Sequence, residues 1–131
     1  MRTFILSFAF MVMGTFFSSA QTTQKEAANK TASKIEAYYF HFNARCVTCM
    51  AVEAEAKSDI ESLYPGKATF KAVNLDDASS KTIADRLKVT GQTLLFVKGN
   101  KQINLTSEGF LYAKTNPAKL KSIIKQKVDA L

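Results

Sequence analysis

The sequence is poor in the residues that usually build metal sites and disulfide networks. Its 131 residues include two cysteines, one histidine and no tryptophan. The cysteines, Cys46 and Cys49, are separated by two residues, so together they can form one redox pair, one metal clip or one structural bridge. With His41 they supply three side chains, whereas a closed zinc site takes four ligands.

The sequence also lacks an apolar run long enough to span a membrane. Arg2 precedes an apolar stretch, 3–17, that is shorter than the roughly 20 residues of a spanning helix and has no basic residue on its C-terminal side. Residues 18–20 are small, as a signal peptidase requires. We therefore expect residues 1–20 to be a signal peptide and the protein to be exported, to the periplasm of a Gram-negative bacterium or otherwise secreted. No cysteine lies near this site, which argues against a lipoprotein anchor.

A second segment without large apolar residues follows. Residues 21–33, QTTQKEAANKTAS, have nothing to bury, so we interpret them as a flexible tether. Cleavage after residue 20 of the 131 would leave 111 residues, which is enough for one domain and too few for two. We place that domain at 34–131.

Basic residues outnumber acidic ones, but they are not gathered in one place. The formal net charge is +7, and the lysines are scattered along the chain. Nucleic-acid-binding proteins mass such residues into patches, so this pattern indicates a solvated basic surface and no nucleic-acid partner.

The first predicted elements are a strand and a long helix. Residues 35–42, IEAYYFHF, are aromatic and free of breakers, which favours a central strand buried on both faces. Asn43 is a good helix cap, and apolar residues then recur every three or four positions until 64–66, Tyr-Pro-Gly, end the helix.

The remaining elements complete the order β-α-β-α-β-β-α. Residues 68–75 alternate as a half-buried strand, and a short helix over 79–88 follows. Residues 93–105 predict two antiparallel strands about a turn at Gly99-Asn100. Asn116 then caps a last helix, with Pro117 at its first position.

Three features occur together: this order of elements, the motif Cys46-Val47-Thr48-Cys49 at the strand-to-helix junction, and the block KVTGQTLLFVKGNK at 88–101. Together they resemble the thioredoxin-like superfamily over nearly all of 34–131. The resemblance implies an α/β fold with a central mixed sheet flanked by helices. It further implies thiol-disulfide exchange with protein thiols and disulfides, by a monomer that needs no cofactor beyond its redox-active disulfide. A membrane protein could donate or accept the electrons.

The chemistry of the pair follows from helix geometry. Residues three apart share one face, so the sulfurs can meet at the N-terminal end of the helix. Unpaired N–H groups there stabilise a thiolate, and Arg45 adds a cation beside Cys46. We therefore predict that Cys46 attacks and Cys49, half covered, resolves the mixed disulfide. A purely structural bridge is the weaker alternative, because so short a loop gains little from closure.

Three positions depart from the superfamily pattern. Arg45 stands where tryptophan usually precedes the first cysteine. Phe40 stands where a buried aspartate is usual, which makes Glu53 the nearest candidate proton acceptor. Gly91-Gln92-Thr93 replaces the block that carries a cis-proline, so we expect trans peptides there. We predict that Gln92 and Thr93, with Val47 and Thr48 between the cysteines, contact the substrate.

Two other function classes stay open at this level. A copper carrier would use both cysteines with Met50 or His41, since two thiolates and a thioether suit Cu(I). A lone histidine in an apolar strand is more often a packed residue. A binding module without turnover could present 110–112 as an aromatic patch, although these residues more often cover the edge of a core. The redox direction is equally open, because Val47-Thr48 matches neither the usual reductase nor the usual oxidase dipeptide.

Overall fold

A computed structural model describes residues 33–131 of the chain. The expected signal peptide, 1–20, and residues 21–32 of the expected tether lie outside the described residues. None of the helices in the described part is both long and apolar enough to cross a membrane.

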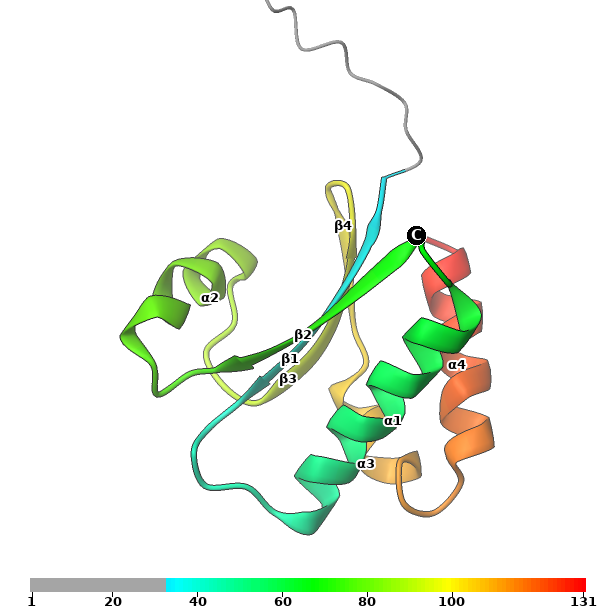
Figure 1. Cartoon of the computed structure of the whole chain (residues 1–131), viewed down its shortest axis with the longest axis horizontal. Helices are drawn as coiled ribbons and strands as arrows, with labels where there is room; N and C mark the ends of the chain where they lie inside the picture. The colour runs from blue at the N-terminus through cyan, green and yellow to red at the C-terminus, as the bar shows by residue number, and fades with distance from the viewer. Residues whose placement is uncertain (1–32) are drawn as a thin grey trace, which may run out of the picture.

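A single mixed sheet forms the centre of the described fold (Figure 1). The spatial order is β2-β1-β3-β4, in which β2 runs parallel to β1 while β3 is antiparallel to both β1 and β4. The four strands are β1 (Ile35–His41), β2 (Ala68–Asn74), β3 (Thr93–Lys98) and β4 (Lys101–Asn104). The chain reverses between β3 and β4 at Gly99, whose φ of 63° suits glycine, so the predicted turn is confirmed.

The central strand β1 is buried on both faces, as predicted. Alternation along the strand divides its side chains between two apolar clusters. Ala37 and Tyr39 belong to one cluster, and Tyr38 and Phe40 belong to the other. Tyr39 is paired with Leu94 of β3 across the sheet.

Helices cover the two faces unequally. The larger layer comprises α1 (Val47–Leu63), α3 (Thr106–Tyr112) and α4 (Pro117–Asp129), which lie together on one side of the sheet in Figure 1. The opposite side carries the short 3-10 turn η1 (Ala78–Ser80) and α2 (Lys81–Leu87). The α/β architecture with a mixed sheet flanked by helices is confirmed.

The start of the last helix follows the prediction closely. The Asn116 side chain accepts a hydrogen bond from the Lys119 N–H, at 3.1 Å, and Pro117 occupies the first helical position. A side-chain cap and a fixed proline φ are both local properties, so they can be recognised without knowing the rest of the fold.

One helix was missed by the sequence pattern. The segment expected to join the last strand to Asn116 contains α3, so the predicted element order lacked one helix. Phe110 and Tyr112 pack against the larger core, while Leu111 is exposed. Gly109 lets α3 approach α1 closely, because a Cβ there would lie 3.0 Å from Cγ1 of Val52. The helix therefore depends on packing rather than on a local signal.

Candidate functional site

The loop between β1 and α1 places both cysteines at the N-terminus of α1. Cys46 is the N-cap residue, with extended backbone angles, and its Sγ accepts a hydrogen bond of 3.0 Å from the Cys49 N–H. The helix therefore begins at Val47, and the prediction that Asn43 caps it was wrong. A helix N-terminus presents unpaired N–H groups, so this arrangement favours negative charge at Cys46.

Asn43 instead ties the loop to the end of β2. Its N–H donates to the Asp76 carboxylate at 2.6 Å, and its side-chain oxygen accepts from the Asn74 amide at 2.7 Å. Both partners lie more than 30 residues away in the sequence. These long-range bonds anchor the start of the loop that leads to Cys46.

The two cysteines form a disulfide, with their Cα atoms 5.0 Å apart. Cys46 is exposed, whereas Cys49 is only 5% exposed and is more deeply covered than the sequence suggested. Cys46 is therefore the member of the pair that lies at the surface. Val47 and Met50 are exposed beside the bridge, at 63% and 49%.

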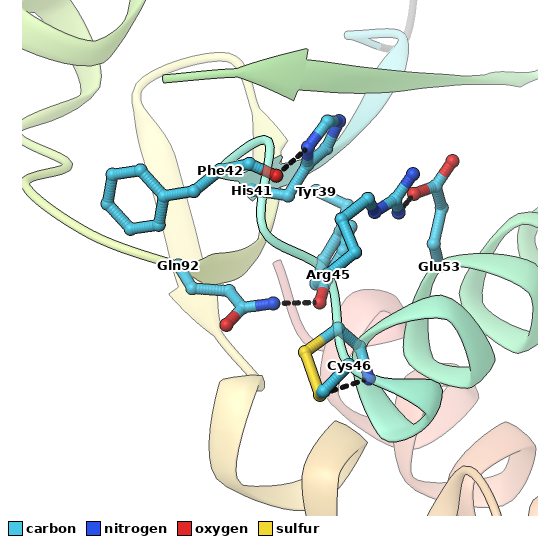
Figure 2. Close-up of a disulfide and its surroundings, with 8 residues drawn as sticks. Tyr39, His41, Phe42, Arg45, Cys46, Glu53 and Gln92 are labelled. Atoms are coloured by element: carbon cyan, nitrogen blue, oxygen red, sulfur yellow. Dashed lines mark hydrogen bonds and ion pairs between the residues drawn. A yellow bond between two sulfur atoms is a disulfide. The ribbon is translucent and has the colours of Figure 1, made fainter. Parts of the chain in front are cut away.

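Arg45 does not stand free beside Cys46. Its guanidinium forms an ion pair with the Glu53 carboxylate, one helical turn beyond Cys49 (Figure 2). The two side chains are 28% and 24% exposed, so the pair is partly covered. The cation expected to act on Cys46 is thus balanced by the carboxylate expected to serve Cys49.

The residue of β1 drawn among the surroundings of the bridge and facing the helix layer is a tyrosine (Figure 2). Phe40, which occupies the aspartate position in the sequence, faces the opposite cluster with Ala84 and Leu87. Tyr39 faces the helix layer, together with Val52 of α1. Sequence reasoning missed Tyr39 because spacing alone does not show which of two alternating residues faces α1.

The Tyr39 hydroxyl is held by the loop before β3. Gln92 donates from Nε2 to the hydroxyl oxygen at 2.6 Å, and both residues belong to the surroundings of the disulfide in Figure 2. Burial raises the pKa of the Tyr39 hydroxyl above its usual value, against smaller opposing effects of Gln92 and Arg45. The phenol is consequently neutral at physiological pH and remains a hydrogen-bond donor.

The block that lacks proline has ordinary backbone geometry. No peptide bond is cis between residues 33 and 131, so the expectation of trans peptides at Gln92 and Thr93 is confirmed. Thr93 turns its hydroxyl to the Gly91 carbonyl at 2.9 Å, while Gln92 turns toward Tyr39. Of these two residues, Gln92 is the one that is hydrogen-bonded to Tyr39.

The residues proposed for metal binding are engaged elsewhere or exposed. His41 Nδ1 lies 3.0 Å from the Phe42 carbonyl oxygen, and its ring stacks on Tyr39 with 6.2 Å between centroids. Met50 is half exposed. Within residues 33–131, no group of three or more His, Cys, Asp or Glu side chains is arranged to hold a metal.

A hollow of about 320 Å³ begins at Phe42, which the sequence did not single out. Phe42 is 39% exposed, and its ring points away from the disulfide in Figure 2. Leu75, Ala84 and Val89 supply apolar lining, and Asp76 and Asp77 add carboxylates. Lys81 also lines the hollow, so its charged lining carries both signs.

Comparisons with known proteins give likeness in fold only. No family model and no curated protein matches the chain. Thioredoxin O2 from Arabidopsis thaliana in the oxidized state has 23% identity and a TM-score of 0.49, over 72% of this chain and 75% of that one. The Fasciola hepatica thioredoxin has 18% identity and a TM-score of 0.48, over 72% and 82%. The germline-specific thioredoxin Deadhead from Drosophila melanogaster has 21% identity and a TM-score of 0.46, over 72% and 81%.

The fold itself is established by its topology. A parallel β1-β2 pair joined through α1, followed by an antiparallel β3-β4 hairpin, gives the mixed order β2-β1-β3-β4. With helices on both faces and a C-X-X-C disulfide at the start of α1, this is a thioredoxin-like α/β fold.

Proposed function

We propose that the protein is an oxidoreductase that exchanges thiols and disulfides with protein substrates through Cys46 and Cys49. The observation that carries the proposal is the asymmetry of the bridge at the N-terminus of α1. Cys46 is exposed at the N-cap, and Cys49 is buried three residues later. A bridge built only for stability would gain nothing from exposing one of its sulfurs, and a loop this short contributes little by closure.

The reaction proceeds in two exchanges. A substrate thiolate attacks the Cys46 sulfur, the Cys46–Cys49 bond breaks, and Cys49 leaves with the electron pair as a thiolate. A second substrate thiolate then attacks the substrate sulfur of the mixed disulfide and releases Cys46 as a thiolate. The substrate loses two electrons and becomes a disulfide, while the protein gains them; the reverse sequence reduces a substrate disulfide.

The N-terminus of α1 supports the attacking role of Cys46. The Cys49 N–H already donates to the Cys46 sulfur, and the positive end of the helix favours a thiolate at Cys46. Exposed Cys46 is therefore the sulfur that forms the mixed disulfide. Buried Cys49 resolves it.

Substrate contacts would come from the residues that surround the bridge. Val47, exposed between the cysteines, offers apolar surface, and Thr48 lies beside it. Gln92, in the loop before β3, and Thr93, the first residue of β3, would border the other side. An extended protein segment lying between these two borders would reach the Cys46 sulfur.

Export completes the proposal. A redox-active disulfide persists in an oxidising compartment, which suits the predicted signal peptide at 1–20. The protein would work there as a monomer without a further cofactor, and a membrane protein would supply or remove its electrons.

Equilibration of the purified, metal-free full chain in glutathione buffers tests this function. Thiol alkylation read by mass spectrometry should show a two-electron transition of the Cys46–Cys49 pair at one definite potential. A low potential would mark a reductase and a high one an oxidant. If no internal disulfide forms at any potential, the exchange function fails, and Cu(I) titration of Cys46, Cys49 and Met50 becomes the decisive measurement.

Trapping separates the two cysteines. Cys49→Ser should accumulate reducible mixed disulfides through Cys46, because the resolving sulfur is gone. Cys46→Ser is the matched control and should trap none, since Cys49 is buried. Equal yields from both variants would contradict the assigned roles.

A further inference from the structure

Within residues 33–131, the Cys49 sulfur, which leaves as a thiolate in the exchange, has no hydrogen-bond donor to stabilise its negative charge. In the mechanism proposed above, on which this inference rests, Cys49 becomes a thiolate while only 5% exposed. The Cys46 sulfur accepts the Cys49 N–H, but within residues 33–131 the Cys49 sulfur accepts no hydrogen bond. A buried charge without a donor is costly, so the neighbourhood of Cys49 must supply one.

Tyr39 offers an unused hydrogen. The residue is fully buried, on the face of β1 that packs against α1. Its hydroxyl oxygen receives the Gln92 amide, so the bond between them does not consume the hydroxyl hydrogen. Among the described hydrogen bonds, Tyr39 donates to no acceptor. Figure 2 draws Tyr39 and Gln92 beside the bridge.

We propose that the Tyr39 hydroxyl, oriented by Gln92, donates a hydrogen bond to the Cys49 sulfur when the disulfide opens. The bond between the substrate sulfur and Cys46 forms, the Cys46–Cys49 bond breaks, and Cys49 takes the electron pair. Tyr39 keeps its proton throughout, so no additional oxidant, reductant or acid is required. Tyr39 thereby stabilises the resolving thiolate. By sequence spacing, the residue expected in that role would be its neighbour Phe40, which occupies the position of the usual aspartate.

The charged and titratable groups around this point do not duplicate the role. Arg45 from the loop and Glu53 from α1 neutralise each other in their ion pair. His41 follows on β1, but its Nδ1 is directed at the Phe42 carbonyl. The Tyr39 hydroxyl is a neutral donor, and among the described hydrogen bonds its hydrogen has no acceptor.

Substitution of the hydroxyl tests the inference directly. The reduced full chain carrying Tyr39→Phe keeps the ring and loses only the oxygen. The pH titration profile of Cys49, read by NMR from its Cβ chemical shift, should move upward by about one pH unit, a tenfold smaller thiolate fraction at a given pH below the pKa. The Cys46 profile should move less, because Cys46 has its own N–H donor.

Tyr38→Phe is the matched control, because Tyr38 is an equally buried tyrosine on the opposite face of β1. Its Cys49 profile should coincide with that of the wild type. Gln92→Leu provides a second variant outside the core and should move the profile in the same direction by less. Unchanged profiles in Tyr39→Phe and Gln92→Leu, or an equal shift in Tyr38→Phe, would overturn the inference.

These measurements separate the inference from the proposed function. The Cys49 titration is read by NMR on reduced protein and does not depend on turnover or on bridge formation. A definite redox potential with an unchanged Tyr39→Phe profile would overturn the role proposed for Tyr39 and support the exchange function. A shifted profile without any redox transition would support the role of Tyr39 and overturn the exchange function.

Discussion

Arg45 illustrates how one contact changes the meaning of a residue beside a reactive cysteine. From the sequence, its charge would act on Cys46 alone. In the structure the guanidinium is paired with Glu53, so the cysteine experiences a cation and an anion together. Because these adjacent charges are opposite in sign, their net influence on Cys46 is smaller than that of either charge by itself.

Removing one partner at a time should therefore move Cys46 in opposite directions. Glu53→Gln leaves Arg45 unbalanced and should lower the pKa of the Cys46 thiol by roughly half a pH unit. Arg45→Ala leaves the carboxylate unbalanced and should raise that pKa by a similar amount, the scale of partly exposed pairs. The measurement is the rate of Cys46 alkylation against pH, at low salt and at 1 M salt. At 1 M salt the Debye screening length is about 3 Å, so both pKa shifts should be smaller.

Glu61→Gln is the control for these variants, because it removes the same charge from an exposed position of the same helix. It should leave the Cys46 profile in place. If Glu53→Gln and Glu61→Gln gave the same shift, Cys46 would be responding to net charge rather than to the ion pair.

At the level of elements, the closeness of α3 to α1 and β3 depends on one glycine. A Cβ on Gly109 would lie 3.0 Å from Cγ1 of Val52 and 3.3 Å from Cδ2 of Leu94, both fully buried. Gly109→Ala gains about 1 kcal/mol in helix propensity but costs about 1–3 kcal/mol in overpacking. We expect the free energy of unfolding in urea to fall by about 1 kcal/mol.

Gly91→Ala is the matched control for α3. No atom lies within 4 Å of a Cβ built there, so its stability should stay within about 0.5 kcal/mol of the wild type. A Gly109→Ala variant as stable as the wild type would mean that α3 can move away from Val52 without loss.

The elements that the sequence predicted are those with strong local signals. The aromatic run of β1, the Gly99 turn and the Asn116-Pro117 start of α4 each carry their own evidence. The start of α1 was misplaced because Asn43, a good cap by type, is recruited by residues distant in sequence. Helix α3 was missed because a seven-residue helix containing glycine has little local preference and is held by packing.

The candidate site divides in the same way. The cysteine pair and its place at the head of a helix follow from spacing, whereas the partners of Arg45 and the orientation of Tyr39 do not. Tyr39 and Phe40 are adjacent aromatic residues, and only the packing of α1 on one face of the sheet distinguishes them. The sequence was therefore sufficient to predict where the cysteine pair lies, and the side chains that surround the pair could be identified only from the fold.

For the whole molecule, the contact between α1 and α4 contains a buried carboxyl group. Asp59 is 4% exposed, and within residues 33–131 its Oδ2 has no hydrogen-bond partner. The neighbouring cation, Lys121 of α4, donates to Ser62 at 2.8 Å. Burial raises the pKa of Asp59 to about 6; Lys121 opposes the rise, and Glu55 adds to it.

This carboxyl makes global stability depend on pH with a definite sign. Asp59 titrates near 3.9 when unfolded and near 6 when folded, so between these values the native state holds a proton that the unfolded state has released. The contribution of Asp59 to the free energy of unfolding therefore falls as pH rises from about 4 to about 6, and stays low above that.

Asp59→Asn, neutral at every pH, should escape this loss. Its stability advantage in urea unfolding should grow from near zero at pH 4 to on the order of 2–3 kcal/mol at pH 7. Asp85→Asn removes the same charge from an exposed position of α2 and should show no such growth. If the Asp59→Asn curve instead ran parallel to the wild type across this range, the native carboxyl would be ionised throughout, and Lys121 would be compensating its burial.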